Sequence, residues 1–292
     1  MKLSITSDPL LLNGTCEGRL TLTTATPVTT TDVTSAGTIY FTPYKGNRIS
    51  LYNGSAWKVY SFSELSLALT ATSGKNYDVF VYDNAGTLTL ELSDAWTNDT
   101  TRDDALALQD GVYVKSGSTT RRWLGTIRAS GTNVCEDSAA KRFVWNYYNR
   151  VLRAVRGTTE TTDTWDYTTD AWRQANANTA NQFEYVAGIA EDAISVKVAT
   201  GANNTGSSAI FSVGIGISSS TVNSAQVLFS GASIGVLNNF VTIESNYVGV
   251  PGMGYFSIRW LERSTAFGVT TFRGDLSNPT IYQAGIFGIL MA

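Results

Sequence analysis

The residues whose types and spacing could perform acid–base chemistry are the carboxylates Asp103 and Asp104, with Glu91 and Asp94 close by in the sequence. A glycosidase needs two carboxyl groups across a sugar cleft, about 5 to 9.5 Å apart. The spacing of these four residues in the sequence does not place any two carboxyl groups at that separation. The adjacent acids instead suit the first turn of a short helix, which the sequence predicts within residues 97–106. We therefore expect that the chain is not an enzyme, although a polysaccharide-degrading activity stays open as an alternative, because glycosidase chemistry needs no histidine.

Cofactor and metal sites are also not expected. The 292 residues include no histidine, which excludes Ser-His-Asp and Cys-His nucleophile systems and His-ligated metals. Asp163, Asp166 and Asp170 invite a calcium site, but they lack the Gly and terminal Glu of an EF-hand loop. Cys16 and Cys135 match no metal spacing, and they form either a long-loop disulfide or two reduced thiols.

The charge and hydropathy of the chain indicate which classes of partner are not expected. The formal net charge is −3, and only 15% of the residues are charged. No dense basic surface is present, so no nucleic-acid partner is expected. No stretch of about 20 apolar residues exists, and Met1 to Ser4 lead into no signal-peptide core, which predicts no membrane association.

Aromatic residues gather between positions 145 and 172 and have two interpretations. Exposed Trp and Tyr rings stack on sugar rings, which would make a glycan site. Alternatively, the rings are buried and hold two domains, or several copies of the chain, together. The candidate residues are Trp145, Tyr148, Trp165, Tyr167 and Trp172.

The elements that must position these residues are β-strands. Thr, Val, Ile and aromatic residues are interrupted by Gly and Asn, which is typical of an all-β protein. Three hairpins are expected, at residues 49–60 with a type I′ turn at Asn53-Gly54, at 77–92, and at 112–127. Residues 142–151 fit either a strand or a helix face, and the strand is favoured.

The chain divides into three parts by pattern. Residues 1–156 read as a β-rich hairpin module, and residues 157–171 as an extended, Thr-rich connector. Residues 172–292 read as a jelly-roll-like β-sandwich, with strands expected at 182–188, 193–199, 209–217, 225–229, 240–248, 255–262 and 283–290. Gly214 and Gly216 are interpreted as close-packing positions in a sheet.

The last predicted strand is apolar on both faces. Its candidate interface residues are Ile286, Phe287, Ile289 and Leu290. An exposed apolar strand is an aggregation hazard, so we expect it to be a central strand or part of a subunit interface.

Several strings of the N-terminal part resemble a module of tailed-bacteriophage and prophage virion proteins. They are residues 18–22, 27–29, the run Tyr40-Phe41-Thr42-Pro43-Tyr44-Lys45-Gly46-Asn47-Arg48-Ile49, residues 51–57, 75–80, 108–112, 121–127 and 141–150. Beyond residue 150 the resemblance is weaker, where residues 172–176 look like the start of the jelly-roll-like domain that often follows.

This resemblance implies a structural component of the virion, such as a tail fibre, head fibre or capsid decoration, assembled in the host cytoplasm. It implies a homo-oligomer, most often a homotrimer, with other virion proteins as partners and no catalytic residues. A receptor-binding fibre module that recognises a bacterial surface glycan is the alternative.

Overall fold

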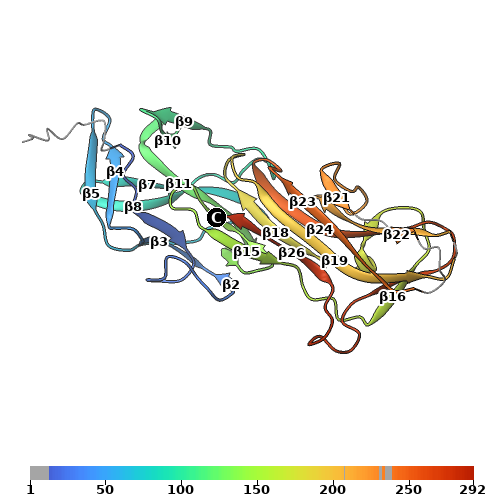
Figure 1. Cartoon of the computed structure of the whole chain (residues 1–292). Coiled ribbons are helices and arrows are strands. Elements are labelled where there is room, and N and C mark those ends of the chain that lie inside the picture. The colour runs from blue at the N-terminus through green and yellow to red at the C-terminus, as the bar shows by residue number, and fades with distance from the viewer. Residues whose placement is uncertain (1–12, 207, 230–231, 234–238) are drawn as a thin grey trace, which may run out of the picture.

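The structure is a computed structural model that describes residues 13–206, 208–229, 232–233 and 239–292. Nearly all of its elements are β-strands, so the all-β prediction is confirmed. The N-terminal strands occupy one end of an elongated molecule and the C-terminal strands the other (Figure 1). The N-terminal strands are β1 (Gly18–Thr21), β2 (Val33–Ala36), β3 (Thr38–Pro43), β4 (Arg48–Tyr52), β5 (Trp57–Ser61), β6 (Leu65–Ala68), β7 (Asn76–Asn84), β8 (Thr87–Leu92), β9 (Leu106–Gln109), β10 (Val112–Lys115), β11 (Ser118–Gly131), β12 (Val134–Asp137), β13 (Lys141–Arg142) and β14 (Val144–Asn146).

The C-terminal half is a sandwich of two sheets. Its elements are β15 (Leu152–Arg156), β16 (Thr164–Tyr167), β17 (Arg173–Gln174), the 3-10 turn η2 (Ala175–Ala177), β18 (Gln182–Ala187), β19 (Ile194–Asn204), β20 (Ile210–Ile217), β21 (Val227–Phe229), β22 (Ala232–Ser233), β23 (Val241–Gly249), β24 (Gly254–Ser264), β25 (Thr270–Arg273) and β26 (Gly285–Met291). The β26 sheet has the order β15-β26-β19-β23-β21, and the β24 sheet contains β18-β24-β20-β22. Consecutive strands from β18 to β24 alternate between the sheets, as strands do in a jelly roll.

Alternating residues of the two sheets form the core between them. Phe183, Val213 and Trp260 come from the β24 sheet, and Val198 and Ile286 come from the β26 sheet. Because successive side chains of a strand point to opposite faces, each strand also leaves every second residue on the outside of the sandwich. The outer faces of the two sheets are therefore the surfaces that a partner or ligand can reach.

The predicted hairpins are present, with one difference in turn type. Ala85 and Gly86 connect β7 to β8 with φ angles of 51° and 95°, as a type I′ turn requires. Tyr52 pairs with Trp57, so four residues rather than two connect β4 to β5. The Asn53 side chain closes this longer turn by accepting hydrogen bonds from backbone N–H groups of the loop.

The predicted helix within residues 97–106 is wrong. Asn98 Oδ1 accepts a hydrogen bond from the backbone N–H two residues on, at 2.9 Å. Asp104 accepts one from the backbone N–H of Asp94 and pairs with Lys115 at 2.9 Å. Short polar side chains that bond the backbone in this way compete with helix formation. The acids therefore fix a turn instead of starting a helix.

The strand interpretation of residues 142–151 is confirmed as far as Asn146, where β14 ends. Two strand pairings cross the predicted division of the chain at residues 156 and 171. Strand β15, predicted within the N-terminal module, pairs along its length with β26 and belongs to the C-terminal sandwich. The predicted connector, residues 157–171, contains β16, which pairs with β25. Both partner strands lie far along the chain, so the local pattern holds no sign of them.

The two halves share a sheet and a common set of contacts. Strand β13 pairs in parallel with β18, which continues the β24 sheet into the N-terminal half. Arg19 on β1 donates a hydrogen bond to the backbone oxygen of Ala292, at 2.6 Å. Residue 292 accordingly lies at the middle of the molecule, between the halves (Figure 1).

Cys16 and Cys135 are both free and buried, so the alternative of two thiols holds and the disulfide does not. Burial raises the pKa of the Cys16 thiol to about 11. No helix in the described part of the chain is long and apolar enough to cross a membrane.

Candidate functional site

The last strand divides its four apolar candidates between two environments. Ile286 and Leu290 are 1% and 2% exposed and lie in the sandwich core, whereas Phe287 and Ile289 are 48% and 46% exposed. Strand β26 is central in its sheet, between β15 and β19. The alternation of side chains across a strand therefore corrects the predicted interface, since only Phe287 and Ile289 can meet a partner.

Neighbouring strands extend this apolar surface beyond β26. Cross-strand pairing places Ile289 beside Ala154 on β15 and Ser195 on β19, and Ser195 beside the exposed Val248 on β23. The next row contains Phe287 and passes Lys197 and Asn246 before it reaches the exposed Leu228. Leu152, at the start of β15, is also exposed. We call the outer surface of the β26 sheet the apolar face, after its apolar residues Leu152, Ala154, Leu228, Val248, Phe287 and Ile289.

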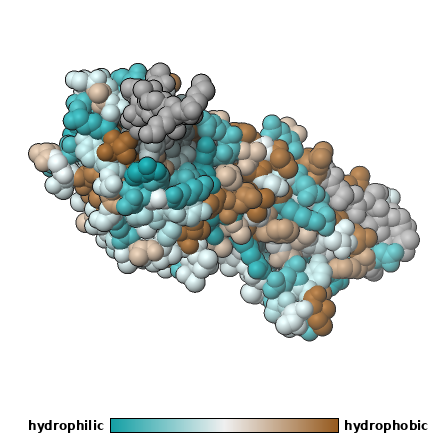
Figure 2. Space-filling view, turned by 60° about the vertical axis from the view of Figure 1, so that its left-hand side comes forward, coloured by the Kyte–Doolittle hydropathy of each residue, from teal (hydrophilic) through white to brown (hydrophobic). Residues whose placement is uncertain are grey.

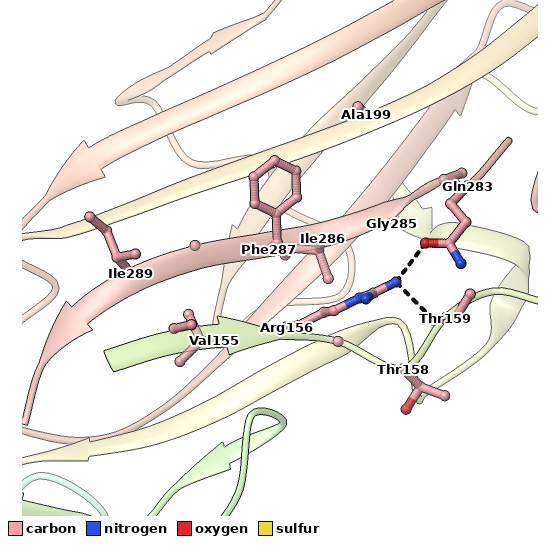
Figure 3. Close-up of a pocket in the computed structure, with 14 residues that line it drawn as sticks. Val155, Arg156, Thr158, Thr159, Ala199, Gln283, Gly285, Ile286, Phe287 and Ile289 are labelled. Carbon is pink, nitrogen blue, oxygen red and sulfur yellow. Dashed lines mark hydrogen bonds between the residues drawn. The ribbon is translucent and has the colours of Figure 1, made fainter. Parts of the chain in front are cut away.

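A groove of about 530 Å³ lies on this face, over β15 and β26. Phe287 and Ile289 project from the same side of β26 into the space that Figure 3 shows, and Ile286 projects from the other side. At one end of the groove, Arg156 donates hydrogen bonds to Gln283 and Thr159, at 2.9 and 3.0 Å. In the view of Figure 2, hydrophobic residues form patches between polar regions across the middle of the molecule.

The charged residues of the apolar face are one ion pair and Arg156, which lacks a carboxylate partner among the described residues. Lys197 and Glu244 form an ion pair of 2.8 Å on β19 and β23. Both side chains are more than a third exposed, so the pair contributes little to stability. Its consequence is that the face carries apolar side chains without a large field of one sign.

Two of the five candidate aromatic residues are buried. Trp145 stacks against Trp123 at 5.7 Å between ring centroids and belongs to the core cluster shared by the two halves. Trp165 stacks against Phe272 at 6.1 Å and donates its indole N–H to Glu262 at 2.6 Å. A sugar cannot reach these rings, so the glycan interpretation is wrong for Trp145 and Trp165. Burial, the other interpretation, describes both.

The remaining three aromatic residues are half-buried in different places. Tyr148 lies against the Arg122 guanidinium, 4.5 Å from its ring centroid, and burial raises its pKa to about 12. Tyr167 lies under Arg173, at 3.9 Å. Trp172 lies on the outer face of the β24 sheet, where it lines a hollow. The structure does not bring the five residues together into one site.

Two carboxylates that suggested acid–base chemistry share one cation, since Lys115 Nζ lies 3.6 Å from Glu91 and 2.9 Å from Asp104. The three acids that suggested calcium chemistry have separate partners. Asp170 pairs with Arg263 at 2.8 Å. Asp163 accepts a hydrogen bond from Ser277, and Asp166 accepts one from Thr271. Among the described residues, no group of three or more Cys, Asp or Glu side chains has an arrangement that could hold a metal ion.

Four residues of the apolar face were not among the predicted interface residues, namely Leu152, Ala154, Leu228 and Val248. The available signal was an apolar residue in both phases of a strand, as in Tyr247 followed by Val248, where Tyr247 is buried and Val248 is exposed. Such a pair indicates a strand whose outer side chain is not suited to water.

Comparisons with known proteins add no family. No protein-family model matches the chain, and no curated protein matches it. Three solved structures show low similarity. BuGH86wt in complex with neoagarooctaose has a TM-score of 0.26 and 10% identity over 88% of this chain, which spans 32% of that chain. The insecticidal delta-endotoxin Cry8Ea1 from Bacillus thuringiensis has a TM-score of 0.27 and 7% identity, covering 94% of this chain and 52% of that one. A chain of infectious bursal disease virus Gt strain has a TM-score of 0.16 and 14% identity, covering 94% and 79%. Similarity at this level leads to no functional conclusion.

Proposed function

We propose that the chain is a non-enzymatic structural protein of a bacteriophage particle, which assembles as a homotrimer through the apolar face of its C-terminal sheet. The observation that supports self-association is the exposure of Phe287 and Ile289 on a central strand, beside a groove of about 530 Å³. Large apolar side chains exposed on the surface in this way mark interaction sites on soluble proteins.

A second copy of the same chain suits this face for an electrostatic reason. Symmetric assembly brings identical surfaces close to one another, and identical charges would then repel. The Lys197–Glu244 pair keeps the centre of the face neutral. The phage assignment depends on the resemblance of the N-terminal strings to virion proteins, and the virion is the expected location.

The oligomeric state tests the assembly. The purified chain is expected to sediment as a trimer, and the double variant Phe287→Glu, Ile289→Glu as a monomer with an unchanged circular dichroism spectrum. Both side chains point outward, so the fold tolerates the change, while burying their exposed halves in an interface is worth about 2 kcal/mol per subunit. Leu108→Glu is the matched control, since Leu108 is an exposed apolar residue of the N-terminal half.

A monomeric wild-type chain at about 10 μM would overturn the assembly, as would equal dissociation of the Leu108→Glu control. The phage assignment is tested separately with an antibody against the chain. It is expected to label particles released from the strain that encodes the chain. Absence of the chain from the proteins of those particles would refute the assignment.

A further inference from the structure

The outer face of the β24 sheet, opposite the apolar face, contains two hollows, one mixed in polarity and one mainly apolar. The first, of about 390 Å³, is lined by Arg259 together with Arg173, Gln174, Gln182, Ser220 and Thr221. The second, of about 270 Å³, is lined by Trp172 together with Asp170, Ile210, Ser212, Arg263 and Thr265. Arg259 and Arg263 lie four residues apart on β24, which separates their Cα atoms by about 13 Å. The hollows are therefore neighbours on one surface.

Arg259 has donor groups left for a ligand. Its Nε donates to Gln182 Oε1 at 3.0 Å, and it forms no ion pair among the described residues. Arg173 in the same hollow is bound to Glu262 at 2.7 Å. A guanidinium without a carboxylate partner favours an anionic group, because its fork of N–H donors matches two oxygens of a carboxylate or phosphate.

The second hollow has a fixed aromatic wall. A Cβ atom on Gly214 of β20 would lie 2.6 Å from Asn223 Oδ1 and 2.9 Å from the Trp172 ring, so the ring packs on the sheet beside the Asn223 side chain. The Arg263 guanidinium lies 6.0 Å from the ring centroid and pairs with Asp170. A rigid, half-buried indole beside a charged donor–acceptor pair suits a sugar ring, which has a C–H face and hydroxyl groups at its rim.

We propose that the two hollows bind one oligosaccharide that carries an acidic substituent. The acidic group pairs with Arg259, and a sugar ring two to three units away stacks on Trp172. A volume of about 270 Å³ is below the range of about 300–1,000 Å³ for drug-sized ligands, so this hollow takes a single ring. Because this surface is opposite the apolar face, binding and self-association are independent properties.

The test measures binding of the full chain to trigalacturonic acid and to the neutral trisaccharide maltotriose by tryptophan fluorescence and calorimetry. We expect the acidic trisaccharide to bind with a Kd of about 1 mM or below, and at least about tenfold more tightly than maltotriose. Arg259→Gln is expected to remove that preference, and Trp172→Ala to weaken both ligands.

The matched control is Arg156→Gln, which removes the same charge from the other sheet, where Arg156 also lacks a carboxylate partner among the described residues. It should leave binding unchanged. Equal weakening by Arg156→Gln would mean non-specific attraction and would overturn the proposal. So would the absence of binding to trigalacturonic acid, or binding that survives Arg259→Gln in a variant with wild-type thermal stability.

Discussion

Glu262 is a carboxylate with an unusual environment inside the sandwich. Its side chain is fully buried, with Trp165 Nε1 at 2.6 Å and Arg173 Nε at 2.7 Å. Burial raises its pKa to about 7, and the two donors offset only part of that effect. The unfolded chain loses this proton near pH 4.5, so from about pH 4.5 to 7 the folded state binds more protons. The free energy of unfolding from this group therefore falls as pH rises through that window.

Glu262→Gln is expected to remove this loss. Between pH 5 and pH 8 the wild type should lose up to about 3 kcal/mol relative to the variant, since one pKa unit corresponds to about 1.4 kcal/mol. Urea denaturation of both proteins at the two pH values measures the difference. If the two chains changed in parallel, the buried carboxylate would not be the cause.

Glu160 provides a control of opposite sign. Burial opposes its ionisation, but hydrogen bonds from Thr162, Asn181 and Asn178 outweigh burial and hold its pKa below the ordinary value. The stability that it contributes is present above pH 4.5 and is lost as pH falls through its lowered pKa. Glu160→Gln should accordingly cost stability at pH 8, where Glu262→Gln gains it.

Single residues of β26 show a limit of sequence interpretation. Ile286, Phe287, Ile289 and Leu290 are apolar in both phases of the strand, so hydropathy cannot say which pair faces the core. The opposing sheet decides, since Ile286 and Leu290 join the cluster formed with the β24 sheet. Trp145 and Trp165 are similar cases, because a ring that stacks on protein and a ring that stacks on ligand have the same sequence signal.

At the scale of the element, we expect alanine substitutions at two glycines of β26 to change the free energy of unfolding by different amounts. A Cβ atom on Gly288 would lie 2.3 Å from the backbone oxygen of Ser195 on β19, and backbone atoms of a central strand cannot move aside. Gly285, on the same strand, has no atom within 4 Å of the corresponding position. Gly288→Ala should therefore lower the free energy of unfolding by about 1–3 kcal/mol, and Gly285→Ala should leave it within about 0.5 kcal/mol. Thermal unfolding of the two variants compares them directly, and equal costs would show that the strand has room at both positions.

Elements formed by local contacts could be predicted, and those formed by distant contacts could not. Turn residues such as Ala85-Gly86 lie between alternating strands, so the β7–β8 hairpin is visible in the sequence. The pairing of β15 with β26 and of β16 with β25 joins segments that no short-range pattern relates. The predicted limits at residues 156 and 171 therefore do not follow the strand pairing. The failed helix shows the converse, since polar residues near Asp104 found tertiary partners that outweighed local propensity.

At the scale of the whole molecule, Arg102 connects the halves. Its Nε donates to Asp78 on β7 at 2.8 Å, its Nη1 lies 2.6 Å from the Met253 sulfur, and its Nη2 donates to the backbone oxygen of Gly188. Asp78 is fully buried, and burial raises its pKa although indole and hydroxyl donors also bind it. One buried ion pair thus lies between an N-terminal strand and two C-terminal loops.

Arg102→Met is expected to cost about 3–5 kcal/mol, because it leaves the Asp78 carboxylate buried without a cation. It also removes the contacts to Gly188 and Met253, so calorimetry should show the single unfolding transition of the wild type separating into two, one for each half. The control is Arg48→Met, which breaks the exposed Arg48–Glu17 pair of 2.9 Å and should leave the unfolding midpoint nearly unchanged without splitting the transition. A single transition with an unchanged midpoint in Arg102→Met would show that the continuous sheet through β13 and β18 is enough to couple the halves.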